Sequence, residues 1–349
     1  MEINMHTKIV LLFAIIIVIA CAIPAVATTK VSGETFVLVG EEPANFLFGK
    51  IVPHSVSARS TYGKDDKGCI TYQEGIDYIV DYKNATIRRT KDSKIPDYSA
   101  NLVRNLKVFD HTKDAGFGNW GLLFYVDYST KERVNLAPKT NQSKYLKKTA
   151  EKLRSGKDIL YIAYGDSITN GGEASTPARI YWQRWADNQK KRFPRAKITT
   201  MNGATGGDST YQGVERLEDK VLKYKPDLVS IAFGMNDNNG GGIPQDIFKS
   251  NLVNMISRIR QVNPDVEIIL VSAFNPNNIW FYNSHRMAEY AKTTQETAKE
   301  QDCAFADVYN LFEKVAAKKG QNALLSNNIN HPNDFGHWLY SLAMDAMSF

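Results

Sequence analysis

The sequence has few of the residues from which metal sites and disulfide scaffolds are built. Its 349 residues include three cysteines and six histidines, and none of them shows the close Cys/His spacing of a zinc site. Two of the cysteines, Cys69 and Cys303, lie far apart, and we expect both to be free thiols. The sequence also lacks a P-loop and internal repeats, which excludes P-loop nucleotide hydrolases and repeat architectures.

The chain also has no large excess of positive or negative charge. The 43 Lys and Arg residues outnumber the 37 Asp and Glu residues by a net charge of only +6. The densest basic run, Lys190–Arg192, is expected at the end of a helix, where cations interact favourably with the helix dipole. We therefore expect no nucleic-acid partner.

A long apolar run near the N-terminus extends from Ile9 to Ile23, after Lys8 and before small residues that end at Ala27. We interpret residues 1–27 as a signal peptide. Two alternatives remain open: a bacterial lipoprotein box ending at Cys21 would leave that cysteine lipidated, and an uncleaved run would be just long enough to anchor the chain in a bilayer. All three predict a secreted or otherwise extracytoplasmic protein.

Residues 30–138 are predicted to form a smaller all-β accessory domain, a sandwich resembling a jelly roll. Two β-rich segments separated by a turn at Lys83–Ala85 predict a hairpin. Aromatic residues such as Trp120 are expected to fill the core, with stacking on sugar rings as the alternative. Residues 139–157 are predicted to be a linker with a short helix. The expected strands are 35–39, 76–82, 86–90 and 121–128.

From Asp158 to the end of the sequence, apolar strand-like runs alternate with helical segments. Such alternation predicts a parallel sheet covered by helices on both faces. Residues 158–349 are therefore predicted to be an α/β domain, a flavodoxin-like three-layer α/β/α sandwich. The expected strands are 159–164, 197–201, 228–233, 266–273 and 304–308, and the expected helices are 178–193, 213–224, 245–262, 284–301 and 337–349.

Four short polar motifs lie at the ends of these predicted elements. Gly165-Asp166-Ser167 follows the first strand, a glycine-rich segment at 202–210 follows the second, and Gly234–Asp237 follows the third. The fourth, His331–His337, leads into the closing helix. Because the carboxyl ends of parallel strands meet at one edge of a sheet, we expect the four motifs to lie close together.

These motifs supply the groups that acyl transfer requires. Ser167 is the candidate nucleophile, and His331 is the candidate base that takes its proton and later returns it to the leaving alcohol. A tetrahedral intermediate also needs hydrogen-bond donors aimed at its oxyanion. The candidate donors are the backbone N–H groups of Ser167 and Gly207 and the side-chain amide of Asn236.

The four blocks, in this order, resemble the SGNH hydrolases, the superfamily of GDSL-type esterases and lipases. The resemblance covers residues 158–349, implies the SGNH fold, and gives Ser167, Gly207, Asn236 and His331 the roles described above. It extends to two-domain secreted carbohydrate acetyl esterases, in which a similar jelly-roll module precedes the catalytic part.

The sequence departs from the family pattern at Asn328, because the family has an aspartate three residues before the histidine. That carboxylate orients the imidazole and stabilises its charged form. Asn328 could present its amide oxygen to the ring instead, a backbone carbonyl could replace it and leave a Ser-His dyad, or the enzyme could be impaired. We retain Asn328 as a candidate catalytic residue and favour a working dyad supported by a neutral acceptor.

Other residues near the motifs have less specific interpretations. Trp280 and Tyr282 follow the fourth strand and are candidates for substrate binding, with loop packing as the alternative. Asp334 is expected to cap the closing helix, and His337 is expected to cap it or pack against it. His111, in the predicted β-domain, shows no chemistry at the sequence level.

Together these features predict a secreted serine esterase that removes small acyl groups, above all acetyl, from carbohydrate. A lipase, lysophospholipase or thioesterase of the same superfamily is the second hypothesis. The third is a carbohydrate-binding protein whose hydrolase domain has decayed. The mechanism requires no metal and no organic cofactor, because side chains and amides suffice.

Overall fold

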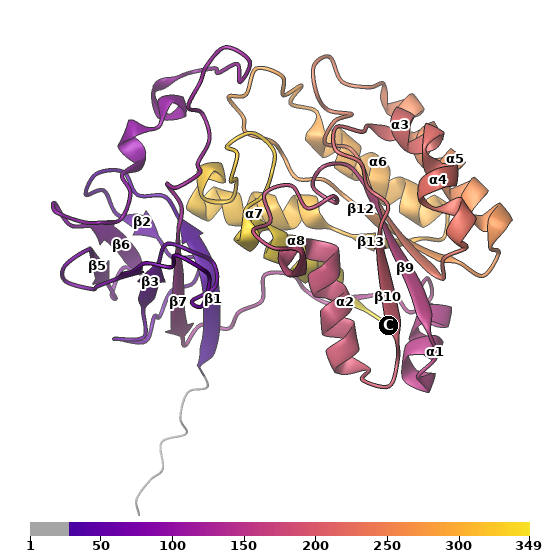
Figure 1. Cartoon of the computed structure of the whole chain (residues 1–349), viewed down its shortest axis with the longest axis horizontal. Helices are drawn as coiled ribbons and strands as arrows, with labels where there is room; N and C mark the ends of the chain where they lie inside the picture. The colour runs from indigo at the N-terminus through magenta and orange to yellow at the C-terminus, as the bar shows by residue number, and fades with distance from the viewer. Residues whose placement is uncertain (1–27) are drawn as a thin grey trace, which may run out of the picture.

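The structure is a computed structural model that describes residues 28–349 (Figure 1). The predicted signal peptide and the lipidation site at Cys21 lie outside this range. Within it, no helix is both long and apolar enough to cross a membrane. Cys69 and Cys303 are free thiols, as the sequence predicts.

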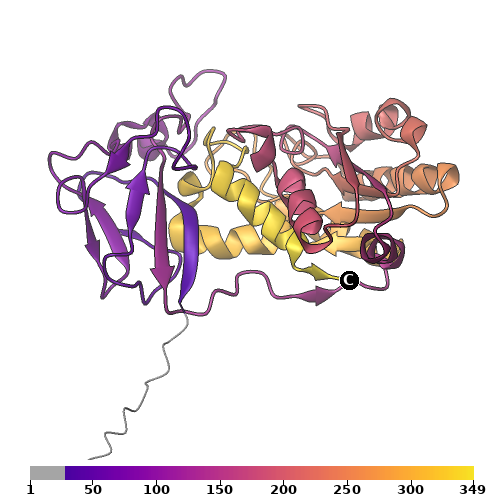
Figure 2. The same cartoon turned by 60° about the horizontal axis from the view of Figure 1, so that its bottom comes forward.

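The N-terminal domain contains two antiparallel sheets (Figure 2). The predicted hairpin is present: β5 (Tyr78–Asp81) pairs with β6 (Thr86–Arg89), and Tyr78 and Val80 are buried while the alternate residues Ile79 and Asp81 are exposed. The rings of Phe36, Phe46 and Phe124 pack within this core. One sheet has the order β1 (Thr29–Phe36), β7 (Phe124–Thr130), β3 (Ser57–Arg59) and β4 (Thr71–Tyr72), and the other has the order β2 (Ala44–Asn45), β6 (Thr86–Arg89) and β5 (Tyr78–Asp81).

The second domain is built on a five-stranded parallel sheet with the order β10-β9-β11-β12-β13. This is the flavodoxin-like order 2-1-3-4-5, so the predicted fold class is confirmed. The interior strand β9 is buried along nearly its whole length because both faces of the sheet are covered. The strands are β9 (Ile159–Gly165), β10 (Ile198–Asn202), β11 (Leu228–Ala232), β12 (Glu267–Val271) and β13 (Ala304–Ala306).

Helices cover the sheet on both sides (Figures 1 and 2). Helices α2, α7 and α8 pack together on the side of the N-terminal domain, and α3, α5 and α6 pack on the other side. The helices are α1 (Lys147–Ser155), α2 (Tyr181–Arg192), α3 (Thr210–Glu215), α4 (Leu217–Lys220), α5 (Gln245–Val262), α6 (Met287–Glu300), α7 (Val308–Lys319) and α8 (Asp334–Asp345). Short strands β8 (Thr140–Asn141) and β14 (Met347–Ser348) pair beside them.

The helix predictions differ from the structure in several places. Helices α2 and α6 each begin three residues later than expected. Helix α7 was not predicted; it begins after Asp307, whose side chain accepts a hydrogen bond from the N–H of Asn310. The predicted helix 213–224 is two short helices and a 3₁₀ turn. Helix α8 begins three residues earlier than expected, and Asn333, not Asp334, is its N-cap.

The N-terminal domain docks against α7, α8 and the loops that carry the sequence motifs. Lys319 of α7 forms an ion pair with Glu34 of β1 in which both side chains are buried, and its ammonium lies 3.4 Å from the centre of the Phe36 ring. Arg179 forms a bidentate ion pair with Asp66, with both N–O distances 2.6 Å. The accessory domain therefore contributes to the surroundings of the motifs.

Candidate functional site

The nucleophile loop is fixed by close packing at the end of β9. A side chain on Gly165 would place its Cβ 2.4 Å from the Ala232 carbonyl oxygen, so only glycine allows this approach. Asp166 is buried, and its carboxylate accepts a hydrogen bond from the N–H of Ile168 at 2.9 Å. Burial raises the pKa of Asp166 to about 7. Asp166 therefore fixes the turn, as predicted, and Ser167 lies at its exposed side.

The fourth motif brings His331 to Ser167 from 164 residues away. The distance between His331 Nε2 and Ser167 Oγ is 2.8 Å. The backbone before the ring is held by Asn327, whose side-chain oxygen accepts hydrogen bonds from the N–H groups of Ile329, Asn330 and His331 at 2.9 to 3.0 Å. Burial lowers the pKa of His331 below 6.5. A neutral imidazole in this position can accept the serine proton.

The candidate oxyanion donors gather at the same edge. Within residues 28–349, neither the N–H of Ser167 nor that of Gly207 donates a hydrogen bond to the protein. Gly207 adopts φ = 82°, which glycine tolerates. Asn236 Nδ2 donates to the Asp208 carbonyl at 2.9 Å, which leaves its second N–H free for a ligand.

Asp237 braces the two loops that carry these donors. Its carboxylate accepts hydrogen bonds from the N–H and hydroxyl of Thr210, at 3.0 and 2.5 Å, and from the N–H of Gly234 at 3.0 Å. Asp237 is fully buried. Its role is the predicted one, a turn-fixing acceptor.

Asn328 is not brought to the catalytic histidine, which corrects its expected role. The residue adopts φ = 58°, and its fully buried side chain points toward the N-terminal domain. Its amide donates to the Tyr98 hydroxyl at 3.2 Å and to the Phe117 carbonyl at 3.0 Å, and its oxygen accepts from Asn277 at 3.2 Å. Among the described residues, no group accepts a hydrogen bond from Nδ1 of His331.

His337 packs in the interior, as expected. It is fully buried, and its ring is stacked on Tyr181 with the planes 10° apart. Burial lowers its pKa to about 3. The neutral ring donates from Nε2 to the Gly172 carbonyl, 3.1 Å away. His337 therefore positions the nucleophile loop.

Trp280 and Tyr282 line an open cavity of about 410 Å³ beside the motifs. Trp280 is largely buried and donates from Nε1 to His111 Nδ1 at 3.0 Å, whereas Tyr282 is partly exposed. No sequence pattern predicts His111 at this position, because docking of the N-terminal domain brings it there. The cavity is lined by His111, Asn239, Trp280, Tyr282, Asn327, Ile329 and Asn330.

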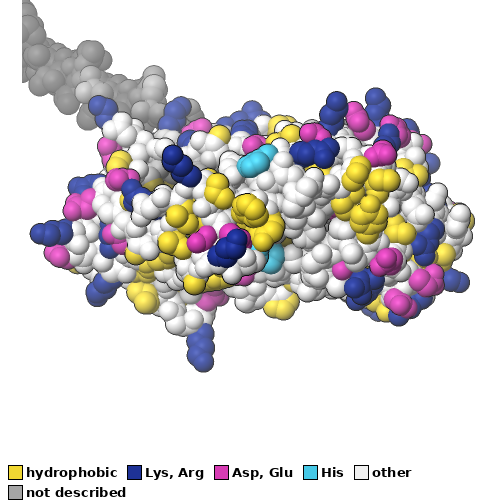
Figure 3. All heavy atoms as spheres, turned by 90° about the horizontal axis from the view of Figure 1, so that it is seen from above, with side chains coloured by type: hydrophobic (Ala, Val, Ile, Leu, Met, Phe, Trp, Pro, Cys, Tyr) yellow, Lys and Arg dark blue, Asp and Glu magenta, His cyan; other side chains and the backbone are white. Residues whose placement is uncertain are grey.

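Two residues that line this cavity hydrogen-bond to candidate catalytic residues. Asn239 donates to the side-chain oxygen of Asn236 at 3.1 Å, and Asn327 holds the backbone of His331. Figure 3 views the molecule from this side and shows hydrophobic and histidine side chains together near the middle of the face.

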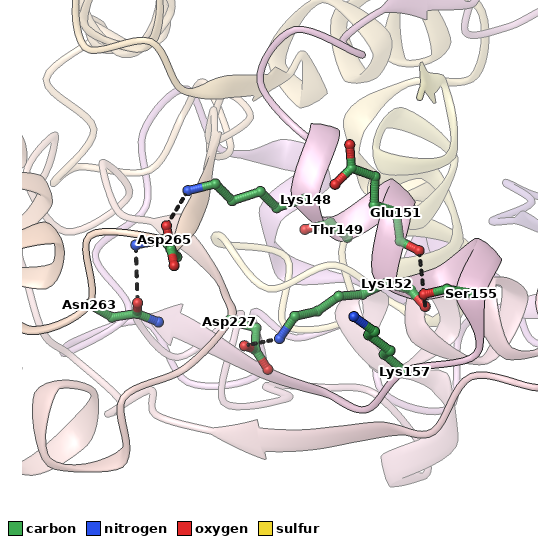
Figure 4. Close-up of a pocket in the computed structure, with 9 residues that line it drawn as sticks. All are labelled: Lys148, Thr149, Glu151, Lys152, Ser155, Lys157, Asp227, Asn263 and Asp265. Atoms are coloured by element: carbon green, nitrogen blue, oxygen red, sulfur yellow. Dashed lines mark hydrogen bonds and ion pairs between the residues drawn. The ribbon is translucent and has the colours of Figure 1, made fainter.

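A second cavity, of about 310 Å³, lies at the opposite edge of the sheet beside α1 (Figure 4). Two of its lysines are neutralised by ion pairs, Lys152 with Asp227 and Lys148 with Asp265, at 2.6 and 2.5 Å. Asp227 and Asp265 precede β11 and β12, so this cavity lies at the amino ends of the strands, away from Ser167.

Comparison with known proteins places this arrangement in a family. Residues 163–339, just over half of the chain, match the GDSL-like lipase/acylhydrolase family. The chain belongs to this family. The family predicted from the four motifs is thus confirmed.

Individual relatives of this GDSL-family protein match over shorter or more divergent stretches. An arylesterase of Vibrio mimicus is 36% identical over 74 residues, which cover 21% of this chain and 36% of the relative. An acetylxylan esterase of Geobacillus stearothermophilus is 22% identical over 209 residues, which cover 55% of this chain and 94% of the relative.

Among solved structures, a two-domain esterase (CEX) active on acetylated mannans is 25% identical, with a TM-score of 0.49. The match covers 59% of this chain and 54% of that one. The chain thus spans about a third of the arylesterase and about half of the two-domain esterase.

Proposed function

We propose that this protein is an exported serine esterase that removes small acyl groups, above all acetyl, from carbohydrate. The observation that carries the proposal is the 2.8 Å contact between His331 Nε2 and Ser167 Oγ, beside two backbone N–H groups, those of Ser167 and Gly207, that donate no hydrogen bond within residues 28–349. Membership of the GDSL-like lipase/acylhydrolase family supports ester hydrolysis as the reaction.

In the proposed mechanism, Ser167 Oγ attacks the ester carbonyl carbon while its proton passes to Nε2 of His331. The oxyanion is stabilised by the N–H groups of Ser167 and Gly207 and by the Asn236 amide. Collapse breaks the ester C–O bond, and His331 returns the proton to the leaving alcohol. Water then attacks the acyl-enzyme by the same route in reverse.

The cavity beside the site supports a carbohydrate alcohol as the leaving group. Trp280 and Tyr282 offer aromatic surface, and the neighbouring amides of Asn239 and Asn330 suit the hydroxyl groups of a sugar. The cavity is open to solvent, which suits a bulky polar alcohol. The name of one sequence relative, acetylxylan esterase, agrees with this substrate class.

The proposal also covers export and domain organisation. Residues 1–27 would direct the chain out of the cytoplasm, with Cys21 lipidation as the alternative to cleavage. Residues 30–138 would form the accessory domain, residues 139–157 the linker with its short helix, and residues 158–349 the hydrolase domain.

A comparison of activity on different substrates tests the proposal. We expect the purified protein to release acetate from acetylated xylan or mannan and to hydrolyse an acetyl nitrophenyl ester faster than a long-chain one. Ser167→Ala should abolish both activities. Preference for the long-chain ester would support a lipase or thioesterase instead. Binding of the polysaccharide without turnover of any ester would support the decayed hydrolase.

A further inference from the structure

The segment after the nucleophile passes directly beside the catalytic imidazole. Gly172 donates its N–H to the Ser167 carbonyl at 2.8 Å and accepts the hydrogen bond from His337. A Cβ atom on Gly172 would lie 3.1 Å from His331 Nδ1. The backbone of Gly172 therefore lies against the edge of the ring that carries Nδ1, and the next residue is Glu173.

Glu173 has an unusual backbone conformation, and its side chain contacts the N-terminal domain. Its backbone has φ = 65°, a left-handed value that costs free energy in a residue with a side chain. Its carboxylate accepts a hydrogen bond from Nε1 of Trp120 at 2.8 Å. Trp120 belongs to the N-terminal domain and packs edge-on against Phe117, with ring centres 5.9 Å apart. The Trp120 indole thus holds the carboxylate of the residue that follows Gly172.

The charges around His331 also indicate an interaction between Glu173 and the His331 ring. Burial lowers the pKa of His331, and the negative charge of Glu173 opposes that effect by raising it. Of the other groups around the ring, the Ser167 hydroxyl hydrogen-bonds it, His337 is buried and neutral across Gly172, and the positive charge of Arg184 acts on His337. The family aspartate is replaced by Asn328, whose side chain bonds elsewhere.

We propose that Glu173 is the positioning residue that supplies the negative charge for the His331 imidazolium, and that Trp120 of the accessory domain holds it in place. The inference rests on the proposed function. When Ser167 Oγ bonds to the ester carbon, its proton moves to Nε2 and the ring becomes positive. The Glu173 carboxylate stabilises that positive charge, and the interaction ends when the proton passes to the leaving alcohol.

The competing explanation is that the Trp120–Glu173 hydrogen bond only joins the two domains. Glu173→Gln separates the two explanations, because glutamine keeps an acceptor for Trp120 and removes the charge. We expect kcat/KM for an acetyl ester to fall about tenfold, since the charge acts on the ring without a direct hydrogen bond. The acid limb of the pH profile should move to lower pH, because the loss of the anion disfavours the imidazolium.

Two further variants complete the experiment. Trp120→Phe removes the indole donor and should lower kcat/KM to a smaller extent, with the charge retained. Glu151→Gln alters an exposed carboxylate of α1 that forms no ion pair in the described structure, and it should change neither rate nor pH profile. An unchanged acid limb in Glu173→Gln would overturn the proposal.

Direct titration of the His331 ring by NMR makes the result independent of activity. The ring signals can be assigned by their absence in His331→Ala. We expect His331 to titrate at lower pH in Glu173→Gln than in the unaltered protein. Equal titration in both would overturn the role of Glu173. Absence of Ser167-dependent turnover in the unaltered protein would instead contradict the proposed function, while the titration still decides whether the charge reaches the ring.

Discussion

At the scale of single residues, the site depends on glycines, because they have no side chain to fill the space at two close contacts. Gly165 lets β9 approach the Ala232 carbonyl, and Gly172 leaves room for the imidazole. The carboxylates of Asp166 and Asp237 accept hydrogen bonds from backbone N–H groups of the loops that carry the motifs. The reactive groups are thus positioned by backbone contacts that a larger side chain would displace.

Gly172→Ala tests this directly. The new methyl group would lie 2.9 Å from the Ser167 carbonyl and 3.1 Å from His331 Nδ1, so the ring and the loop must move apart. We expect kcat/KM to fall about 100-fold, because a displacement on the order of 1 Å is enough for such a loss. The matched control is Gly241→Ala, where a Cβ atom meets nothing within 4 Å. Equal activity of the two variants would contradict the assigned geometry.

At the scale of helices and strands, the sequence predicts best where burial is continuous. The five strands of the parallel sheet are predicted to within a few residues, because most of them are short apolar runs; the exception is β10 (Ile198–Asn202) at the edge of the sheet. Helix α5 was predicted with its observed bounds, Gln245–Val262. Helix α7 is not predicted because Val308, its first residue, continues the apolar run of the preceding strand. Hydrophobic periodicity alone does not separate two short adjoining elements.

The candidate site was predictable to the extent that it consists of local motifs. Ser167, His331, Gly207 and Asn236 follow strand ends or precede a helix, so the fold class brings them together. Asn328 was assigned by spacing from His331, but its left-handed backbone conformation directs the side chain elsewhere. Contributions of the accessory domain, such as His111 and Trp120, depend on contacts between distant segments that no local pattern encodes.

His337, in helix α8, makes the stability of the protein depend on pH. The pKa of His337 is about 3 in the folded protein and near 6.5 in the unfolded chain, so between these pH values the His337 ring binds more protons in the unfolded chain. The contribution of neutral His337 to the free energy of unfolding is fully present above pH 6.5 and is lost as the pH falls toward 3. Between pH 7 and pH 4.5 the loss should be about 2.5 kcal/mol, and His337→Gln should remove this part of the decline. Denaturant unfolding at pH 7 and 4.5 measures it, and identical declines in both proteins would contradict it.

At the scale of the whole molecule, the two domains form one catalytic surface. The buried ion pair between Lys319 and Glu34 and the bidentate pair between Arg179 and Asp66 hold the accessory domain beside the nucleophile loop. Leaving either charge of the Lys319–Glu34 pair alone in the interior would be costly, so this docking is strongly specified. The same docking brings Trp120 and His111 to the rim of the site.

The measurement that tests the central claim most directly is covalent labelling with a serine-reactive phosphonate, mapped by mass spectrometry. We expect a single label on Ser167, no label in Ser167→Ala, and much slower labelling in His331→Ala. Because burial lowers the pKa of His331, the labelling rate should fall only below pH 6.5. Modification of another serine, or equal labelling with and without His331, would contradict the assignment of a Ser167–His331 hydrolase.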